Sequence, residues 1–97
     1  MKLVIRPEAE QDLAEASNWY SRHGDRVKQS FVARIEATLD RILLKPGRFP
    51  HAKAQLRRAT VREFPYSIYY RVAGNEIIVF AVLHHSRDLT VLGGRLH

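Results

Sequence analysis

The chain has 97 residues, of which 45% are hydrophobic and 27% charged, a composition typical of one globular domain with one core and unlike that of disordered segments. It contains no cysteine, which excludes disulfide bonds and thiolate metal sites. The net charge is +6, and residues 41–71 carry eight Lys or Arg against one acid, Glu63, so the charge favours an anionic partner (RNA, DNA or an acidic protein segment) over a uniformly solvated surface.

The first residues and the apolar runs of the sequence indicate where in the cell the protein is expected. Residues 1–6 reach Pro7 and Glu8 too soon to hold the apolar run of a signal peptide. The longest apolar stretch, residues 77–83, is too short to cross a bilayer. The sequence therefore predicts a cytoplasmic protein without a membrane partner, with residues 1–97 forming a single domain.

The first elements are a strand over residues 2–6 and a helix that begins at Pro7. Pro suits the first helical position, where no backbone N–H is needed. One face of this helix is apolar, and Gly24 is expected to end it. The residues of that face recur at intervals of four, three and four: Ala9, Leu13, Ala16 and Tyr20.

A second helix is predicted from Asp25, as its N-cap, to the region of Lys45, before Pro46-Gly47. Its apolar positions also share one face: Phe31, Ile35, Leu39 and Ile42. Two amphipathic helices joined by a tight turn form a hairpin, and the apolar face of that hairpin has to be covered.

The second half of the chain supplies the cover as strands over residues 55–64, 66–72 and 76–85. Pro65 separates the first two, and Gly74-Asn75 is typical of a hairpin turn. The last strand is apolar on both faces, as a central strand should be. The helical hairpin is expected to pack on one face of an antiparallel sheet, and the functional site is expected on the other, partly open face.

Three stretches together resemble the RelE/ParE toxins of bacterial toxin–antitoxin pairs: Leu56-Arg57-Arg58, residues 64–72 (FPYSIYYRV) and residues 78–88 (IVFAVLHHSRD). The opening, residues 6–13, is similar to the first helix of that family, with Arg6 where a Ser usually stands. The resemblance implies an α+β, RelE/ParE-like fold: an N-terminal strand and a hairpin of two helices on an antiparallel sheet that a three-strand C-terminal meander completes.

The resemblance also implies a function that can take two forms. RelE-like members cleave messenger RNA on the ribosome without a metal, and ParE-like members are proteins that trap DNA gyrase on cleaved DNA. Both are neutralised by a cognate antitoxin, whose acidic or amphipathic C-terminal segment wraps the toxin in a hetero-oligomer. An inactive remnant that only binds its antitoxin is a third interpretation. No cofactor is implied.

The nuclease pattern of RelE is mostly absent from this chain. Its Arg after the last strand matches Arg87, but its other Arg falls on Ser67 and its terminal Tyr on Gly93, while its lysines fall near Arg58 and Thr60. Each missing group removes a contact to the transition state. This depletion favours a ParE-like gyrase poison that is not an enzyme.

A metal-independent endoribonuclease would need an altered catalytic set, for which Arg62, His84 and Arg87 are the candidates. The chain offers three further side chains that could act as an acid or a base: His85, Asp88 and His97. Because neighbouring residues of a strand point to opposite faces, His84 and His85 are not expected to bind one metal ion.

Further side chains are candidates for contacts with the target or the antitoxin: Trp19, Arg57, Arg58, Arg62, Arg71, His85, Arg87, Asp88 and Arg95. Each also has a structural interpretation, since an Arg-Asp pair at a strand end forms local hydrogen bonds and the other arginines can be solvated. In the C-terminal tail, Gly93-Gly94 argues against a stable final helix, so Arg95 and His97 are expected to be mobile.

Overall fold

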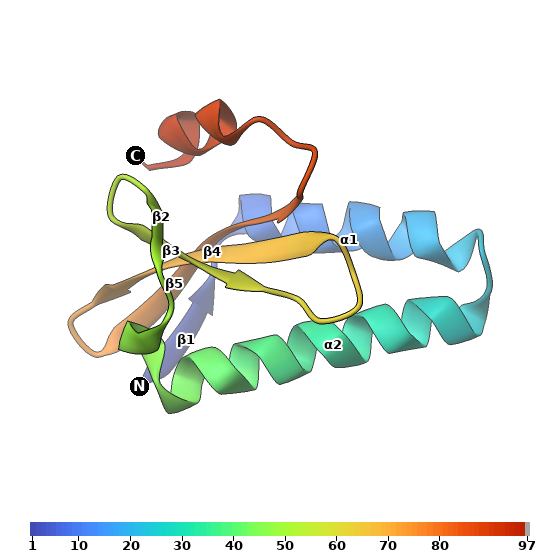
Figure 1. Cartoon of the computed structure of the whole chain (residues 1–97), viewed down its shortest axis with the longest axis horizontal. Helices are drawn as coiled ribbons and strands as arrows, with labels where there is room; N and C mark the ends of the chain where they lie inside the picture. The colour runs from blue at the N-terminus through green and yellow to red at the C-terminus, as the bar shows by residue number, and fades with distance from the viewer. Residues whose placement is uncertain (97) are drawn as a thin grey trace.

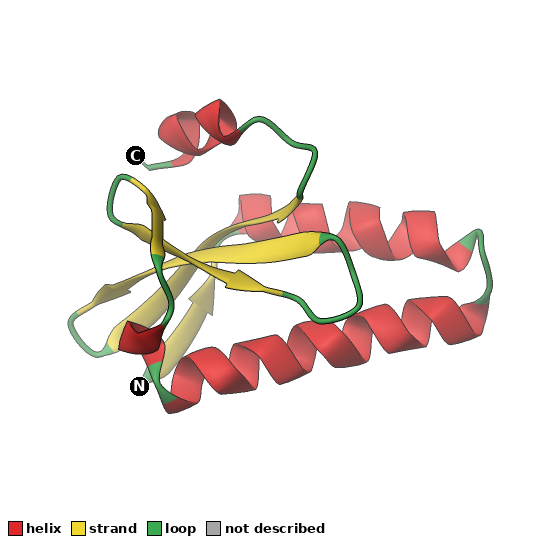
Figure 2. Ribbon diagram, viewed as in Figure 1, coloured by secondary structure: helices red, strands yellow, loops and turns green. Residues whose placement is uncertain are grey.

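The computed structural model describes residues 1–96. In chain order its elements, with η for 3₁₀-helices, are β1 (Lys2–Ile5), α1 (Pro7–Ser21), α2 (Asp25–Leu44), η1 (Pro46–Arg48), β2 (His51–Lys53), β3 (Leu56–Thr60), β4 (Tyr66–Ala73), β5 (Glu76–His84) and η2 (Leu89–Arg95). The two long helices form an antiparallel hairpin beside the twisted sheet (Figures 1 and 2). The predicted α+β fold is confirmed.

The sheet has the strand order β1-β5-β4-β3-β2 and is mixed rather than antiparallel throughout. The meander β3-β4-β5 is antiparallel as predicted, but β1 runs parallel to β5, with Lys2 opposite Glu76 and Ile5 opposite Val79. After β1, the helical hairpin carries the chain to the far side of the sheet, where β2 forms the other edge. The strands β3, β4 and β5 then lead back across the sheet, so β5 lies beside β1. This gives the apolar β5 a neighbour on each side.

Two local expectations were wrong at element ends. The strand predicted over residues 55–64 ends at Thr60, because Glu63 adopts a positive φ of 70° in the turn that follows, and the short β2 pairs with its beginning. Asp25 is the first residue of α2 and not its N-cap; Gly24, with φ of 124°, takes that position without a side-chain bond. A glycine suits this backbone conformation because it has no Cβ.

Apolar side chains fill both faces of the sheet. The helix-side core holds Phe31, Ile35 and Ile42 of α2 against Ile68 and Tyr70 of β4. A second core lies on the opposite face and contains Leu56, Tyr69, Phe80, Ala81, Leu83 and Leu92. A β-bulge in β5 contributes to the second core. Tyr69 pairs with Ala81 and Tyr70 pairs with Val79, so Phe80 is the extra residue of the bulge. As a result, both Phe80 and Ala81 face the second core.

The C-terminal segment covers this second core, which overturns two expectations. Residues 89–95 form η2, and Leu92 is fully buried there, so the tail is an ordered part of the fold up to Leu96 (Figure 1). The glycine pair was misleading because Gly93 and Gly94 lie on the exposed side of η2 while its apolar residues face the sheet. The second face is therefore not open, and His97 lies outside the described residues.

Candidate functional site

The surface contains an open groove of about 570 Å³ between α1 and the adjoining ends of β4 and β5. One wall comes from α1 and the other from the strand ends and the turn after β5. Its lining residues are Asp12, Glu15, Ala16, Trp19, Tyr20, Pro65, Tyr66, Val82, Leu83, His84, Ser86 and Arg87. The candidates Trp19, His84 and Arg87 thus share one site.

Aromatic rings form much of this groove. Trp19 is 50% exposed, and its ring centre lies 5.0 Å from that of Tyr20 and 4.3 Å from that of His23. Across the groove, Tyr66 meets His84 edge to face at 5.2 Å. Burial raises the pKa of the Tyr66 hydroxyl, so this group stays protonated at neutral pH. The groove therefore offers apolar surface, neutral hydrogen-bonding groups and the charged side chains of Glu15 and Arg87, which suits an amphipathic partner segment.

The hydrogen bonds of His84 fix its role. Its Nδ1 accepts the backbone N–H of Ser86 at 3.0 Å and lies 2.9 Å from the Ser86 hydroxyl. A backbone N–H only donates, so Nδ1 carries a lone pair and the neutral ring holds its proton on Nε2. In this tautomer Nε2 is a hydrogen-bond donor, and the Nδ1 lone pair is engaged by Ser86.

His85, the next residue, lies on the other side. Its Nε2 is 3.0 Å from the hydroxyl of Ser67, which is buried in β4. Ser67 is the residue that occupies the expected position of a catalytic arginine, and it serves here as a partner for His85. The structure does not bring the two histidines to one site.

The remaining nuclease candidate, Arg62, is also separate from the groove. Its charge lies close enough to Arg41, in the last turns of α2, to lower the pKa of that guanidinium, although burial of Arg41 is the larger cause. His84 and Arg87 line the groove, whereas Arg62 lies beside α2 in the turn after β3. The three proposed catalytic residues are therefore not assembled.

The other arginine candidates lie along the sheet. Arg71 of β4 stacks its guanidinium on Phe80 at 5.1 Å from the ring centre, and Arg6 approaches the same ring at 5.0 Å. Arg57 donates from Nη1 to the carbonyl of Phe49 at 2.6 Å, and Arg58 is exposed on β3.

Arg87 and Asp88 form the turn between β5 and η2. The Arg87 N–H donates to the carbonyl of His84, and the guanidinium remains exposed at the groove. Asp88 caps η2: its Oδ1 accepts the N–H of Thr90 at 2.9 Å. Arg87 is thus available to a partner, whereas Asp88 has a structural task.

This cap predicts a local response to acid. Hydrogen bonds from Thr90, the backbone one first, hold the pKa of the Asp88 carboxyl below its ordinary value of 3.8. Because the folded-state pKa is depressed, the cap stabilises η2 above pH 3.8 and is lost as the pH falls through the lower folded value. The Thr90 amide resonance should therefore titrate in NMR with a midpoint below 3.8, and should not respond in Asp88→Asn. A midpoint at or above 3.8 would contradict the cap.

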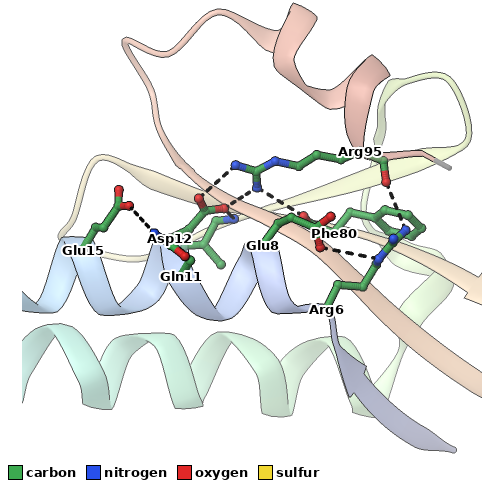
Figure 3. A network of polar contacts seen from close by, with 8 residues as sticks. Arg6, Glu8, Gln11, Asp12, Glu15, Phe80 and Arg95 are labelled. Atoms are coloured by element: carbon green, nitrogen blue, oxygen red, sulfur yellow. Dashed lines mark hydrogen bonds and ion pairs between the residues drawn. The ribbon is translucent and has the colours of Figure 1, made fainter.

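Arg95 is anchored inside the protein (Figure 3). Its guanidinium makes two bonds to the Asp12 carboxylate, at 2.5 and 3.0 Å, and a third to the carbonyl of Phe80 at 3.3 Å. Asp12 also accepts the backbone N–H of Val82 at 2.9 Å, and Arg6 donates to the carbonyl of Arg95. These bonds fasten the C-terminal segment to α1 and β5, so the mobility expected for Arg95 is wrong. The pKa of Arg95 is raised, chiefly by the bonds to Asp12.

No pattern in the sequence indicates the role of Asp12, because a carboxylate in the first turns of a helix is already explained by the helix dipole. Within residues 1–96 no group of three or more His, Asp or Glu side chains is placed to hold a metal ion. No helix of that range combines the length and apolar character needed to cross a bilayer.

Comparison with known proteins identifies the family. The model of the ParE toxin of the type II toxin–antitoxin system, parDE, matches residues 3–89. The chain belongs to the ParE toxin family. The predicted RelE/ParE resemblance, ParE-like in preference to RelE-like, is confirmed. The match ends at Leu89, so most of η2, including Arg95, lies beyond the matched residues.

A solved structure shares the fold of this toxin. It is described as a chromosomal ParDE TA system from P. aeruginosa, with a TM-score of 0.77 and 22% sequence identity over 87% of this chain and 95% of that chain. A search of curated proteins finds no match.

Proposed function

We propose that this toxin acts in the cytoplasm on DNA gyrase, as a protein that traps the enzyme on cleaved DNA, and that a cognate antitoxin neutralises it by binding the groove beside Trp19. The observation that carries the proposal is the composition of the groove. Exposed aromatic surface and the exposed guanidinium of Arg87 are features of a protein-binding site.

The dispersed nuclease set supports the same proposal. Cleavage of RNA without a metal needs a base, an acid and cations around a single phosphate. Here Arg62 lies apart from the other two candidates, and Nδ1 of His84 is already engaged by the backbone N–H of Ser86. His84 and Arg87 do share the groove, so the alternative of a ribosome-dependent ribonuclease is tested alongside.

A paired assay separates the alternatives. Toxin released from its antitoxin is added to gyrase with supercoiled DNA and, in parallel, to ribosomes with bound messenger RNA. Cleaved DNA should accumulate while the messenger stays intact. Cut messenger with unaffected gyrase would establish the ribonuclease instead, and activity in neither assay would identify an inactive remnant.

Arg87→Ala should reduce gyrase trapping by about tenfold, the loss expected when one guanidinium contact at an interface is removed. Arg22→Ala, at the exposed end of α1, is the matched control. Equal activity of the two variants would remove Arg87 from the target-binding surface.

A further inference from the structure

A cluster of arginines surrounds Phe49 where the end of α2, η1 and β3 meet. The guanidinium carbons of Arg41 and Arg48 lie 5.4 and 5.0 Å from the centre of the Phe49 ring. Arg57 donates to the carbonyl of the same residue at 2.6 Å. The ring and the carbonyl therefore hold three guanidinium groups in place before any ligand binds.

The charge of Arg62 also lies near this group, at Arg41. Burial lowers the pKa of Arg41, and the charges of Arg62 and Arg48 lower it further. Arg57 and Arg48 both act on the hydroxyl of Tyr70, opposing the rise in its pKa that burial causes. Arg48 is thus near both Arg41 and Arg57. We call Arg41, Arg48, Arg57 and Arg62 the arginine cluster.

The arginine cluster lacks internal neutralisation. Glu63, the one acid in residues 41–71, forms its ion pair with Arg34. The other ion pairs within the described chain join Arg6 to Glu8 and Arg95 to Asp12, so no member of the cluster has a carboxylate at ion-pair distance there. Like charges held together raise the free energy of the unbound toxin, and an anion that bridges them lowers it.

The surroundings of the arginine cluster favour phosphates over an acidic protein segment. Phe49 and Tyr70 are buried, so the rings that hold the arginines offer little surface to a protein partner. A protein interface draws its affinity from buried apolar anchors, and rim ion pairs contribute about 1 kcal/mol or less each. A nucleic-acid backbone needs only cations, and the guanidinium fork matches the oxygens of a phosphate.

We propose that the arginine cluster binds the phosphate backbone of double-stranded DNA without reading its sequence. This surface is distinct from the groove beside Trp19. It would allow the toxin to bind DNA while the region of the groove binds the target protein. The inference rests on the proposed function only for the cellular source of the DNA, the segment bound by gyrase. Binding itself is measurable without gyrase.

The test is the fluorescence anisotropy of a labelled duplex of about 20 base pairs, titrated with free toxin between about 50 and 200 mM salt. Each phosphate neutralised contributes about −0.9 to the slope of log K against log salt, so four arginines predict a slope of about −3.6. The triple variant R41Q/R48Q/R62Q should weaken binding by about tenfold or more and bring the slope to about −0.9. Arg57 is retained because its bond to Phe49 belongs to the fold.

The matched control is R22Q/R26Q/K28Q, which removes the same charge from exposed positions at the end of α1 and in the first turn of α2. Circular dichroism and urea unfolding verify that both triple variants are folded. Absence of DNA binding by the wild type, or an equal loss in both variants, would overturn the inference. So would a triple variant that binds DNA normally but no longer binds the antitoxin, since the cluster would then serve a protein.

The two proposals fail separately. Gyrase trapping by a toxin that does not bind DNA alone would refute the arginine cluster as a DNA site and leave the proposed function intact. Salt-dependent DNA binding through the arginine cluster without an effect on gyrase would refute the proposed function and leave the DNA site intact.

Discussion

Asp12→Ala should lower the free energy of unfolding by about 3 kcal/mol in urea denaturation. The Asp12 and Arg95 side chains are only 9% and 15% exposed, so the substitution leaves a largely buried guanidinium without its carboxylate. It also removes the acceptor of the Val82 N–H in β5. An unpaired buried charge and an unsatisfied backbone donor are each destabilising, and the two penalties act together.

Two comparisons isolate this anchor. Glu10→Ala, an exposed acid on the same helix, controls for the change in helix propensity and net charge and should alter stability by less than about 0.5 kcal/mol. A double-mutant cycle with Arg95→Ala should give a coupling energy of about 1–3 kcal/mol. If Asp12→Ala is as stable as Glu10→Ala, the apolar contacts of η2 alone hold the C-terminal segment.

The elements that the sequence predicted correctly depend on local patterns. The apolar spacing of α1 and α2, the proline at the start of α1 and the alternation along β4 each involve residues within a few positions of one another. Such patterns report which face of an element is buried. Membership of the family followed from the order and spacing of these same elements.

The errors arose where distant residues decide the structure. Arg95 and Asp12 are 83 positions apart, and no periodicity links them. The second core exists because a bulge turns Phe80 and Ala81 to the same face, and Leu92 then covers it. A glycine pair in a tail predicts disorder only when nothing in the tertiary structure fixes the residues around it.

The candidate site was predictable in part. Trp19, His84 and Arg87 stood out by residue type, and the groove brings them together. Asp12 and Tyr66 were not recognised as its lining because each had a sufficient local explanation, in a helix dipole and in a core stripe. Arg62 does not line the groove, because the turn at Glu63 places it near Arg41 of α2.

Trp19→Ala should weaken the antitoxin complex by about 2 kcal/mol or more, roughly thirtyfold in Kd, measured by isothermal titration calorimetry. The indole is half exposed in the free toxin, and it stands against Tyr20 at the rim of an aromatic groove. A partner segment that covers it would bury a large, rigid surface at small cost in conformational entropy, which is why tryptophan so often dominates interfaces. The stability of the toxin alone should change by less than about 1 kcal/mol.

Leu44→Ala is the matched control, since Leu44 is 78% exposed and lies outside the groove. If the two variants bind the antitoxin equally well, the groove is not its binding site. Salt provides an independent check, because an interface anchored by apolar burial should lose little affinity as salt rises, whereas phosphate contacts at the arginine cluster should weaken steeply. An antitoxin complex that is insensitive to Trp19→Ala and dissolves at moderate salt would place the antitoxin on the arginine cluster, and both surfaces would then need to be reassigned.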